Sequence, residues 1–493
     1  MSLTITSAVQ NSFLLYLPDE VLYEILLMLT FGEMVQISQI CRKLRRVATT
    51  HSKLWQHLPT VTVSMLHNLD PFIEHSRALG FDLEVWKIAL GDLPTLGPWL
   101  HKNLGRIRKL CLDFNELTAG QIPDANALAI LHNGLSRPAP LLEILTLEYD
   151  WFLPFLGSLR PDILGGVIAP KLRELSVTAF TLDVPCPGLQ GVQTVRTSVG
   201  GISPRLSAAQ NLAVHSLFPA IKHLALEGIH GEDAGIVGNA ILYPLARVPP
   251  LDGPLSSLTL SWTDGDDWPD ARAAAWLASS VHLVQRVELE TLQCALVAGA
   301  VLASHPEKAH TLHISRHNNG VNSCLALAHL SLDSQVLRSA ILTPSDARSH
   351  LHDFLLGGAY LRLEALKLST DQTCMELLKQ VPGAWDALPK LRTLSLNLEW
   401  SSVGENGWFI TPETLLSIPP MNNIRTLEVI SPPAYWWNKR HFPHDVDLRC
   451  TVAFSKVVLP KSERAIFRFP NRVSVLQLQP IIQPPGMPVT SRP

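Results

Sequence analysis

Two hydrophobic patterns divide the chain. Between Pro18 and Val47 apolar residues recur every three or four positions, which is the spacing of amphipathic helices. Thr30-Phe31-Gly32 interrupts this spacing, so the segment predicts a short helical hairpin or trio. From about residue 106 onward a second pattern, apolar-x-x-apolar-x-apolar, returns repeatedly, and its last two apolar positions alternate as in a β-strand.

The strand-like pattern recurs at intervals of commonly about 25–35 residues, a period typical of repeat proteins. Its strong copies are Ile107-Leu110-Leu112, Leu142-Leu145-Leu147, Leu172-Leu175-Val177, Ile221-Leu224-Leu226, Leu255-Leu258-Leu260, Val284-Val287-Leu289, Leu363-Leu366-Leu368, Leu391-Leu394-Leu396, Ile424-Leu427-Val429 and Val473-Leu476-Leu478. A weaker copy is Ala309-Leu312-Ile314, and degenerate ones surround Val192-Val195 and Leu337-Leu342. Helices are predicted between copies, for instance over Asp124–Asn133, Asp270–Ser279 and Thr373–Gln380. One such unit cannot close a core, so stacked units are expected to share one.

This arrangement resembles the leucine-rich repeat family. The resemblance implies an α/β fold, an irregular solenoid with parallel strands on its concave face. The family's usual Asn after the last apolar position is found only at Asn115, which indicates a divergent form. Chance is the alternative, because Leu-rich sequences often contain L-x-x-L; several copies preceded by Pro and a short turn, such as Pro170-Lys171-Leu172, favour repeats.

Composition narrows the class of protein. Apolar residues make up 46% and charged residues 17%, so most of the chain is expected to fold. The formal net charge of −3 gives no reason to expect nucleic acid or a membrane surface as partner. The 7 Cys are scattered without a C-x-x-C pair, which favours reduced thiols over disulfides or a metal site. The N-terminus lacks the features of a signal peptide, and no apolar run reaches the length of a membrane span, so a cytoplasmic and/or nuclear location is expected.

No catalytic signature emerges. The chain has no G-x-S-x-G, G-x-x-x-x-G-K-[ST] or H-E-x-x-H motif, so we expect no enzyme activity, no cofactor and no metal. His310, His313 and His317 have a superficially ligand-like spacing, but His313 lies within a predicted strand, and exposed histidines are the favoured interpretation.

The N-terminal helical segment resembles the F-box family along its whole length. The matching positions, in family order, are Leu17-Pro18-Asp19-Glu20, Ile25-Leu26, Leu29, Ile40-Cys41-Arg42 and Leu54-Trp55. The resemblance implies a substrate adaptor of a Skp-cullin-F-box ubiquitin ligase. By the same resemblance, the residues facing the Skp-type adaptor would be Leu17, Pro18, Ile25, Leu29, Val35, Ile40 and Cys41. Leu44, where many members have an aromatic residue, and the turn Thr30–Glu33 depart from the family and put the strength of that binding in doubt.

The predicted organisation follows from these patterns. A flexible tail is expected over residues 1–16, the F-box over 17–57, a helical linker or cap over 58–105, repeats over 106–480 and a Pro-rich disordered tail over 481–493. Such irregular repeats behind an N-terminal F-box resemble the architecture of many fungal F-box proteins. The alternative is a non-catalytic scaffold solenoid whose N-terminal helices only cap the repeats.

The target-binding side is predicted more loosely. Charged residues at exposed strand positions include seven acids (Asp113, Glu148, Glu174, Glu227, Glu288, Glu290, Glu428) and three bases (Lys109, Arg286, Lys367). We therefore hypothesise that the concave face prefers a basic segment of a protein target, the alternative being that these charges only solvate the strands. Aromatic anchors are expected in loops, at Trp262 and Trp268, at Trp400 and above all at Tyr435-Trp436-Trp437. The identity of the target cannot be read from the sequence.

Overall fold

The computed structural model describes most of residues 16–477. Its larger gaps are residues 115–124, 150–156, 199–212, 230–235, 242–247, 263–270, 398–420 and 431–463, with shorter gaps elsewhere. The chain divides into two compact units, the first reaching to about residue 255 and the second covering residues 256–493. Residues 1–15 of the N-terminal tail predicted over 1–16 lie outside the described residues, and so does the tail predicted over 481–493.

The first unit begins with the predicted short helices. These are α1 (Asp19–Leu27), α2 (Phe31–Ile40), α3 (Arg42–Thr50) and a single 3-10 turn, η3 (Ser52–Trp55). The next segment, predicted as a helical linker or cap, contains η4 (Val63–Leu69), α4 (Asp70–Ser76) and α5 (Leu93–Asn103). It also contains a strand that the sequence pattern did not indicate, β1 (Phe81–Val85).

Parallel strands form the rest of the first unit. Their order is β1-β2-β3-β5-β7-β8, and each pairs with its neighbour in parallel. Their bounds are β2 (Ile107–Asp113), β3 (Ile144–Glu148), β5 (Glu174–Val177), β7 (Thr194–Ser198) and β8 (His223–Ile229). The helices that accompany these strands are α6 (Ala125–Leu135) and α8 (Val214–Leu217), and β4 (Gly157–Ser158) and β6 (Phe180–Thr181) form a separate pair.

The core of this unit is a ladder of apolar side chains at equal register. Leu110, Leu145, Leu175, Val195 and Leu224 follow one another across the strands, and all are buried. The alternate residues point to the other face, as the strand period requires. The predicted copies of the repeat pattern in this unit are therefore strands with their last two apolar positions facing the core.

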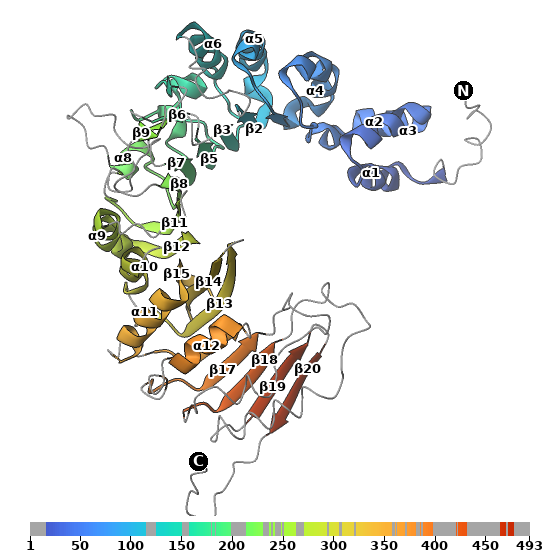
Figure 1. Ribbon diagram of the computed structural model, residues 1–493. Helices are drawn as coiled ribbons and strands as arrows, with labels where there is room; N and C mark the ends of the chain where they lie inside the picture. The colour runs from blue at the N-terminus through green and yellow to red at the C-terminus, as the bar shows by residue number, and fades with distance from the viewer. Residues whose placement is uncertain are drawn as a thin grey trace, which may run out of the picture. The chain divides into compact units, whose positions relative to one another are not determined.

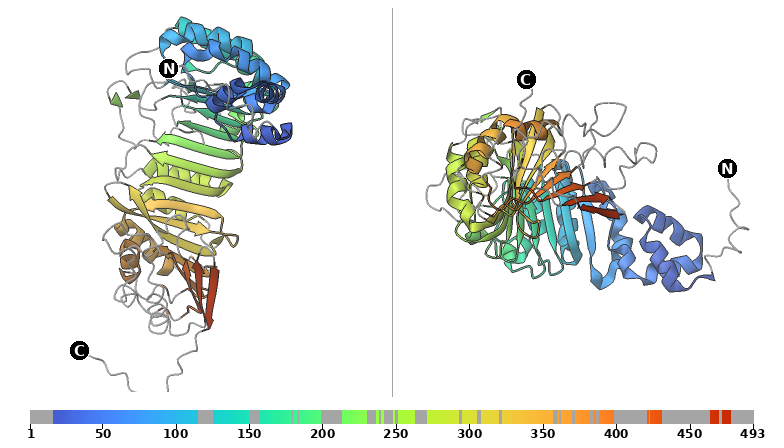
Figure 2. Two further views of the ribbon diagram at one scale, coloured as in Figure 1. Left: turned by 90° about the vertical axis from the view of Figure 1, so that its right-hand side faces the viewer. Right: turned by 90° about the horizontal axis from the view of Figure 1, so that it is seen from below.

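Helices α5 and α6 pack closely on one side of these strands (Figures 1 and 2). Their contact rests on two glycines, Gly97 and Gly134. A Cβ added at Gly134 would lie 2.7 Å from the carbonyl oxygen of Gly97, closer than side chains tolerate. The glycines thus let two backbones approach to a distance that any other residue would prevent.

The second unit is also a sheet with helices along one face. Its strand order is β11-β12-β15-β14-β13-β16-β17-β18-β19-β20. The strands are β11 (Leu255–Trp262), β12 (Val284–Leu292), β13 (Thr311–Asn319), β14 (Asn322–Leu330), β15 (Val336–Leu342), β16 (Ala365–Ser369), β17 (Thr393–Asn397), β18 (Thr426–Ile430), β19 (Arg464–Phe469) and β20 (Arg472–Gln477). The helices are α9 (Ala271–Ser280), α10 (Ala295–Leu302), α11 (Pro344–Leu356) and α12 (Gln372–Gln380).

Two strands of the second unit depart from the parallel arrangement. β14 pairs antiparallel with both β13 and β15, and these three strands lie between β12 and β16 in the order β15-β14-β13. β20, which contains Val473 and Leu476 of the last predicted copy, pairs antiparallel with β19. The prediction of uniformly parallel strands is therefore wrong at these two places. Alternating apolar positions do not indicate whether a strand runs parallel or antiparallel to its neighbour, and a short connection between strands produces a hairpin.

The predicted helices are confirmed. Asp124–Asn133 corresponds to α6, Asp270–Ser279 to α9 and Thr373–Gln380 to α12. The fold is thus a set of N-terminal helices followed by mixed α/β structure with a large, mainly parallel sheet. Within the described part of the chain, no helix is long and apolar enough to span a bilayer.

Candidate functional site

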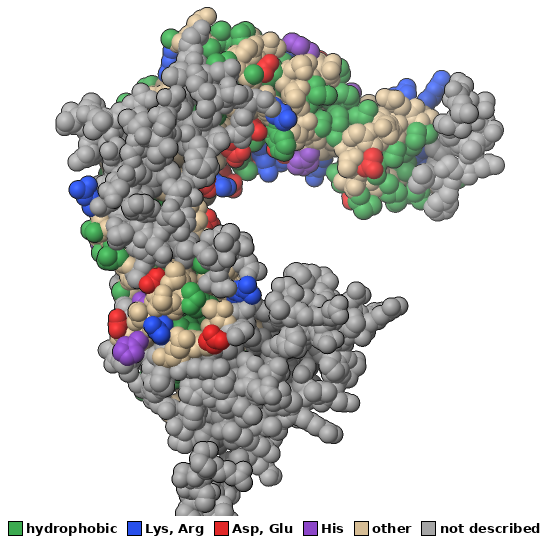
Figure 3. All heavy atoms as spheres, viewed as in Figure 1, with side chains coloured by type: hydrophobic (Ala, Val, Ile, Leu, Met, Phe, Trp, Pro, Cys, Tyr) green, Lys and Arg blue, Asp and Glu red, His purple; other side chains and the backbone are tan. Residues whose placement is uncertain are grey.

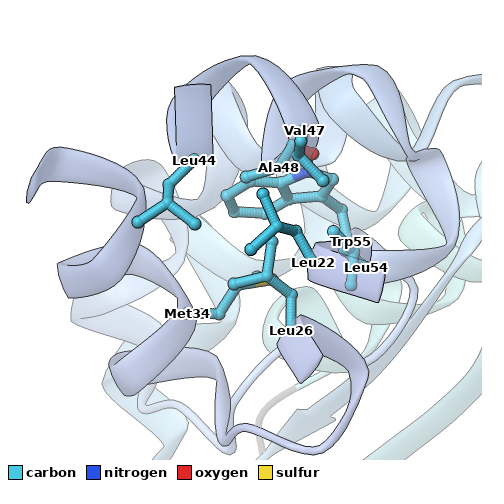
Figure 4. Packing of buried hydrophobic residues seen from close by; sticks show 8 residues of the cluster. All are labelled: Leu22, Leu26, Met34, Leu44, Val47, Ala48, Leu54 and Trp55. Carbon is cyan, nitrogen blue, oxygen red and sulfur yellow. The ribbon is translucent and has the colours of Figure 1, made fainter. Parts of the chain in front are cut away.

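The N-terminal helices enclose a small core. Figure 4 shows its members, which are Leu22, Leu26, Met34, Leu44, Val47, Ala48, Leu54 and Trp55. Helix α1 contributes Leu22 and Leu26, spaced by one turn, and Leu29 packs partly against the same cluster. The Trp55 indole N–H donates to the carbonyl oxygen of Ala48 at 2.7 Å, so its one polar atom is satisfied inside the core.

The unusual sequence of the turn between α1 and α2, Thr30–Glu33, is explained by the structure. Thr30 and Glu33 form a capping box, in which the Glu33 carboxylate accepts from the Thr30 backbone at 2.9 Å. These bonds hold the pKa of Glu33 below its ordinary value. Phe31 turns inward and packs edge-on against Trp55. The departure from the family turn therefore serves the fold of these helices.

The joint between α2 and α3 is built around Cys41. Its backbone is extended, and its Sγ accepts from the backbone N–H of Leu44 at 3.4 Å, which caps α3. Lys43 on α3 donates to the carbonyl oxygen of Leu17 at 2.6 Å, and Arg46 pairs with Asp19 at 2.8 Å. These contacts hold the start of α1 against α3, so that Leu17 and Pro18 are kept in place at the surface.

A second apolar stripe of α1 faces outward. Val21 and Met28 are exposed and Ile25 is half-buried, and the three are spaced as one helix face beside the core stripe. Met28 is 79% exposed. Leu27, next to it, and Ile40, at the end of α2, are exposed as well. Figure 3 shows hydrophobic side chains reaching the surface over α1.

The seven residues predicted to face a Skp-type adaptor are all accessible. Pro18 and Ile40 are exposed, while Leu17, Ile25, Leu29, Val35 and Cys41 are half-buried. The set predicted from the sequence does not include Val21, Leu27 or Met28. The signal that finds Val21 and Met28 is their spacing of seven, offset by one position from Leu22 and Leu29.

An aromatic cluster joins these helices to the following segment. Phe72 of α4 stacks on Trp55, with ring centroids 5.5 Å apart and planes at 19°, and meets Phe31 edge-on at 5.1 Å. His75 adds a fourth ring at 5.1 Å from Trp55. The core of the N-terminal helices is therefore completed by α4.

The chain after Trp55 runs along β1. Asp82 donates its backbone N–H to Gln56 at 2.6 Å, and Val61 donates to Glu84 at 3.0 Å. The Asp82 carboxylate also lies 2.7 Å from the His57 imidazole and accepts two bonds from Arg108 of β2. The N-terminal helices are thus tied to the sheet of the first unit by backbone bonds, ion pairs and ring stacking.

Comparison with known families agrees with this geometry. Residues 14–59 match the family described as F-box-like. The helices α1 to α3 and the turn η3 lie within the match, so the N-terminal part of the chain is an F-box-like domain. No curated protein matches the chain in sequence.

The predicted acidic face lies on the strand side opposite the core in the first unit. Asp113 and Glu148 are register neighbours on β2 and β3. Burial raises the pKa of Glu148, and Asp113, Glu227 and Glu84 raise it further, while Arg196 lowers it. Arg196, which the sequence pattern did not single out, donates to Glu227 on the next strand. The face is acidic but contains one internal ion pair.

The remaining target residues are more scattered. Glu288 is half-buried and Glu290 exposed on β12, and Glu428 on β18 accepts from Ser395 at 2.7 Å. Trp262, at the end of β11, is half-buried, and its backbone N–H donates to Thr291 at 2.9 Å. Trp268, Trp400, Trp436 and Trp437 lie outside the described residues.

The histidines His310 and His313 do not share a ligand site, and the Cys111 thiol is not activated. His310 faces Glu364 at 3.8 Å, whereas His313 meets the Asn397 amide at 3.4 Å, so the two histidines have different partners. Burial, and then the acids Glu148, Glu84 and Asp113, raise the pKa of Cys111 to about 12. A thiol with that pKa stays protonated and is a poor nucleophile.

Proposed function

We propose that this chain is the substrate-recognition subunit of a Skp-cullin-F-box type ubiquitin ligase. In this role the F-box-like domain binds a Skp-type adaptor, and the strand-helix units, a divergent leucine-rich repeat solenoid, bind a protein target. The chain itself would be non-catalytic: it would raise the local concentration of the target near a ubiquitin-conjugating enzyme. A cytoplasmic and/or nuclear location suits that role.

The observation that carries the proposal is the outward stripe of α1. Val21, Ile25 and Met28 form apolar helix surface that remains after Leu22, Leu26 and Leu29 have supplied the core. Exposed apolar surface of this kind is costly in water and is typical of a helix-packing interface with another protein. Leu17, Pro18, Val35, Ile40 and Cys41 are accessible on the same domain and would extend the interface.

The target would meet the strand face. The acids around Glu148, which Arg196 offsets in part, support a basic segment as ligand, because a cation placed there would lower the energy of several carboxylates at once. On the second unit Glu288, Glu290 and Glu428 would contribute in the same way. Trp262, and the loop with Trp436 and Trp437, are the proposed aromatic anchors.

The adaptor half is tested with a matched pair of variants. Met28→Glu places a charge in the outward stripe, and Met65→Glu makes the same change in η4, at a side chain that is 49% exposed. We expect a purified Skp-type adaptor to bind the wild type and Met65→Glu equally. A buried unpaired charge at the interface should weaken binding by Met28→Glu at least tenfold, by about 1.4 kcal/mol or more.

Failure of the wild type to bind any Skp-type adaptor would overturn the proposal. It would favour the alternative, a scaffold whose N-terminal helices cap the strand units, for which the Trp55–Phe72 stack already gives a structural reason. If the adaptor does bind, affinity capture with Met28→Glu identifies the target, because a target that is bound but not ubiquitylated accumulates on the variant.

A further inference from the structure

The apolar ladder of the second unit is interrupted on two neighbouring strands. Val287 of β12, Arg338 of β15, His329 of β14 and Leu312 of β13 occupy successive register positions, and Leu366 of β16 follows. Val287, Leu312 and Leu366 are fully buried, as a core ladder requires. Arg338 and His329 are equally deep, at 3% and 1% exposed. Buried polar groups in core positions cost stability, and their presence here therefore indicates a functional site.

Arg338 is a buried positive charge held by neutral groups. Its N–H groups donate to four backbone carbonyls and a hydroxyl over 2.6–3.3 Å, namely those of Val281, Val284, Gln285, Leu337 and Ser304. Burial lowers its pKa to about 10, so the guanidinium remains charged at neutral pH. Among the residues that the structure describes, no carboxylate forms an ion pair with it. The charge is hydrogen-bonded but not neutralised.

His329 presents an unused nitrogen beside that charge. Its Nε2 lies 2.9 Å from the hydroxyl oxygen of Tyr360. Burial lowers the pKa of His329 to about 3 and raises that of the Tyr360 phenol, so both are neutral at pH 7. When the phenol donates to Nε2, the imidazole proton sits on Nδ1, which has no hydrogen-bond partner in the described part of the chain. A buried N–H without an acceptor is a rare and costly feature.

A pocket of about 120 Å³ is lined by residues that include Arg338 and His329. Its lining is His282, Leu283, Val284, Gln285, Ser304, Lys308, His329, Leu337 and Arg338. Of these residues, the basic Arg338 and His329 are buried, whereas Lys308 and His282 are exposed. No carboxylate is among the lining residues. The volume exceeds the share of a single water in the liquid, about 30 Å³, several times over.

We propose that this pocket binds a small tetrahedral oxyanion of the phosphate type. Lys308 and the Nδ1–H of His329 would donate to its oxygens. Arg338, whose own donors are occupied, would act as a fixed charge that the anion neutralises. Binding would stabilise the second unit, because the ligand satisfies groups that the fold alone leaves uncompensated. The site is independent of the F-box-like domain and of adaptor binding.

The test is thermal unfolding of the full-length protein. Sodium phosphate is titrated in place of sodium chloride at constant ionic strength, so that screening does not change. We expect Tm of the wild type to rise with phosphate concentration. Lys308→Met removes one charged donor from an exposed position and should weaken the apparent affinity about 10- to 100-fold. Lys390→Met, at another exposed lysine of the same unit, is the control and should behave as wild type.

A second variant keeps the proposal falsifiable through the buried residues. His329→Leu restores the apolar ladder and should fold, but it should lose most of the phosphate-dependent rise. Calorimetric titration of phosphate into wild type and both variants gives the affinities directly. A Tm that does not respond to phosphate at constant ionic strength would mean a water-filled hollow around a structural arginine, and so would equal responses of the wild type and Lys308→Met.

Discussion

The F-box-like helices and the strand-helix units solve the problem of apolar burial differently. In the helices, Leu22 and Leu26 fill a small core while Val21 and Met28, their immediate chain neighbours, stay exposed. In the sheets, residues such as Leu145 are buried in a ladder of apolar side chains that continues from strand to strand, and the opposite face is polar. Surplus apolar surface of this kind is typical of an interface with another protein. A solvated polar face does not, because water already satisfies it.

The difference also concerns self-sufficiency. About forty residues bury too little surface to be stable alone. In the F-box-like domain, Trp55 is covered by Phe72 and His75 of the next segment. A strand in the sheet, by contrast, has equivalent neighbours on both sides. Trp55 is therefore the point at which the helices depend on the rest of the chain.

The largest predicted effect comes from Trp55→Ala. The indole is 2% exposed, stacks on Phe72 and donates to Ala48, so its loss should destabilise the helices by about 3–5 kcal/mol. Hydrogen exchange measured by mass spectrometry on the full chain should show lost protection over residues 19–55. Protection of β16 and β17 should be unchanged. Trp86→Ala, at a Trp of the same unit that is largely exposed, is the control. Uniform loss over the whole chain would contradict the local dependence.

A smaller effect separates two helical glycines in different surroundings. Gly134→Ala would push a Cβ to 2.7 Å from the Gly97 carbonyl oxygen and should cost about 1–3 kcal/mol. Gly299→Ala on α10 meets nothing within 4 Å and should stabilise its helix by about 0.5–1 kcal/mol. Chemical denaturation of the two variants should therefore give shifts of opposite sign. Shifts of the same sign would show that the α5–α6 contact is not limited by these glycines.

The sequence predicted elements well where the signal was local. The strands around Leu110-Leu112 and Leu394-Leu396 could be predicted, because alternation of apolar residues in a short run directly indicates a buried strand face. The segments α6, α9 and α12 were predicted as helices that lie between copies of the strand pattern. The residues facing outward on α1 were partly missed, because Val21 and Leu22 look alike in sequence and only packing decides which is buried.

Features that depend on distant partners were not predicted. Phe31 is an unusual residue for its turn, and it is explained by its packing against Phe72, which is far along the chain. The direction of β14 depends on its connections, not on its own apolar residues. Arg338 and His329 become unusual only when register places them beside Val287 and Leu312. The charge balance of the acidic strand face was not predicted either, because Arg196 pairs with Glu227 only across neighbouring strands.

The smallest predicted effect tests whether the acidic face holds unrelieved repulsion. Glu148 has a pKa raised by burial and by like charges, so the folded chain binds its proton more tightly than the unfolded chain. Its ionisation therefore costs stability at neutral pH, and the cost disappears as pH falls below the unfolded value of about 4.3. Glu148→Gln should raise Tm slightly at pH 7, and the difference should shrink towards zero near pH 4.

Arg196→Gln sharpens this prediction. Arg196 lowers the pKa of Glu148, so its removal should enlarge the benefit of Glu148→Gln at pH 7. Scanning calorimetry of the two single variants and the double variant at several pH values measures that coupling. A difference between wild type and Glu148→Gln that does not vary with pH would mean that Glu148 is as well solvated as in the unfolded chain. A basic partner would then gain nothing from repulsion at this face, and the preference for a basic target would lose its physical basis in the first unit.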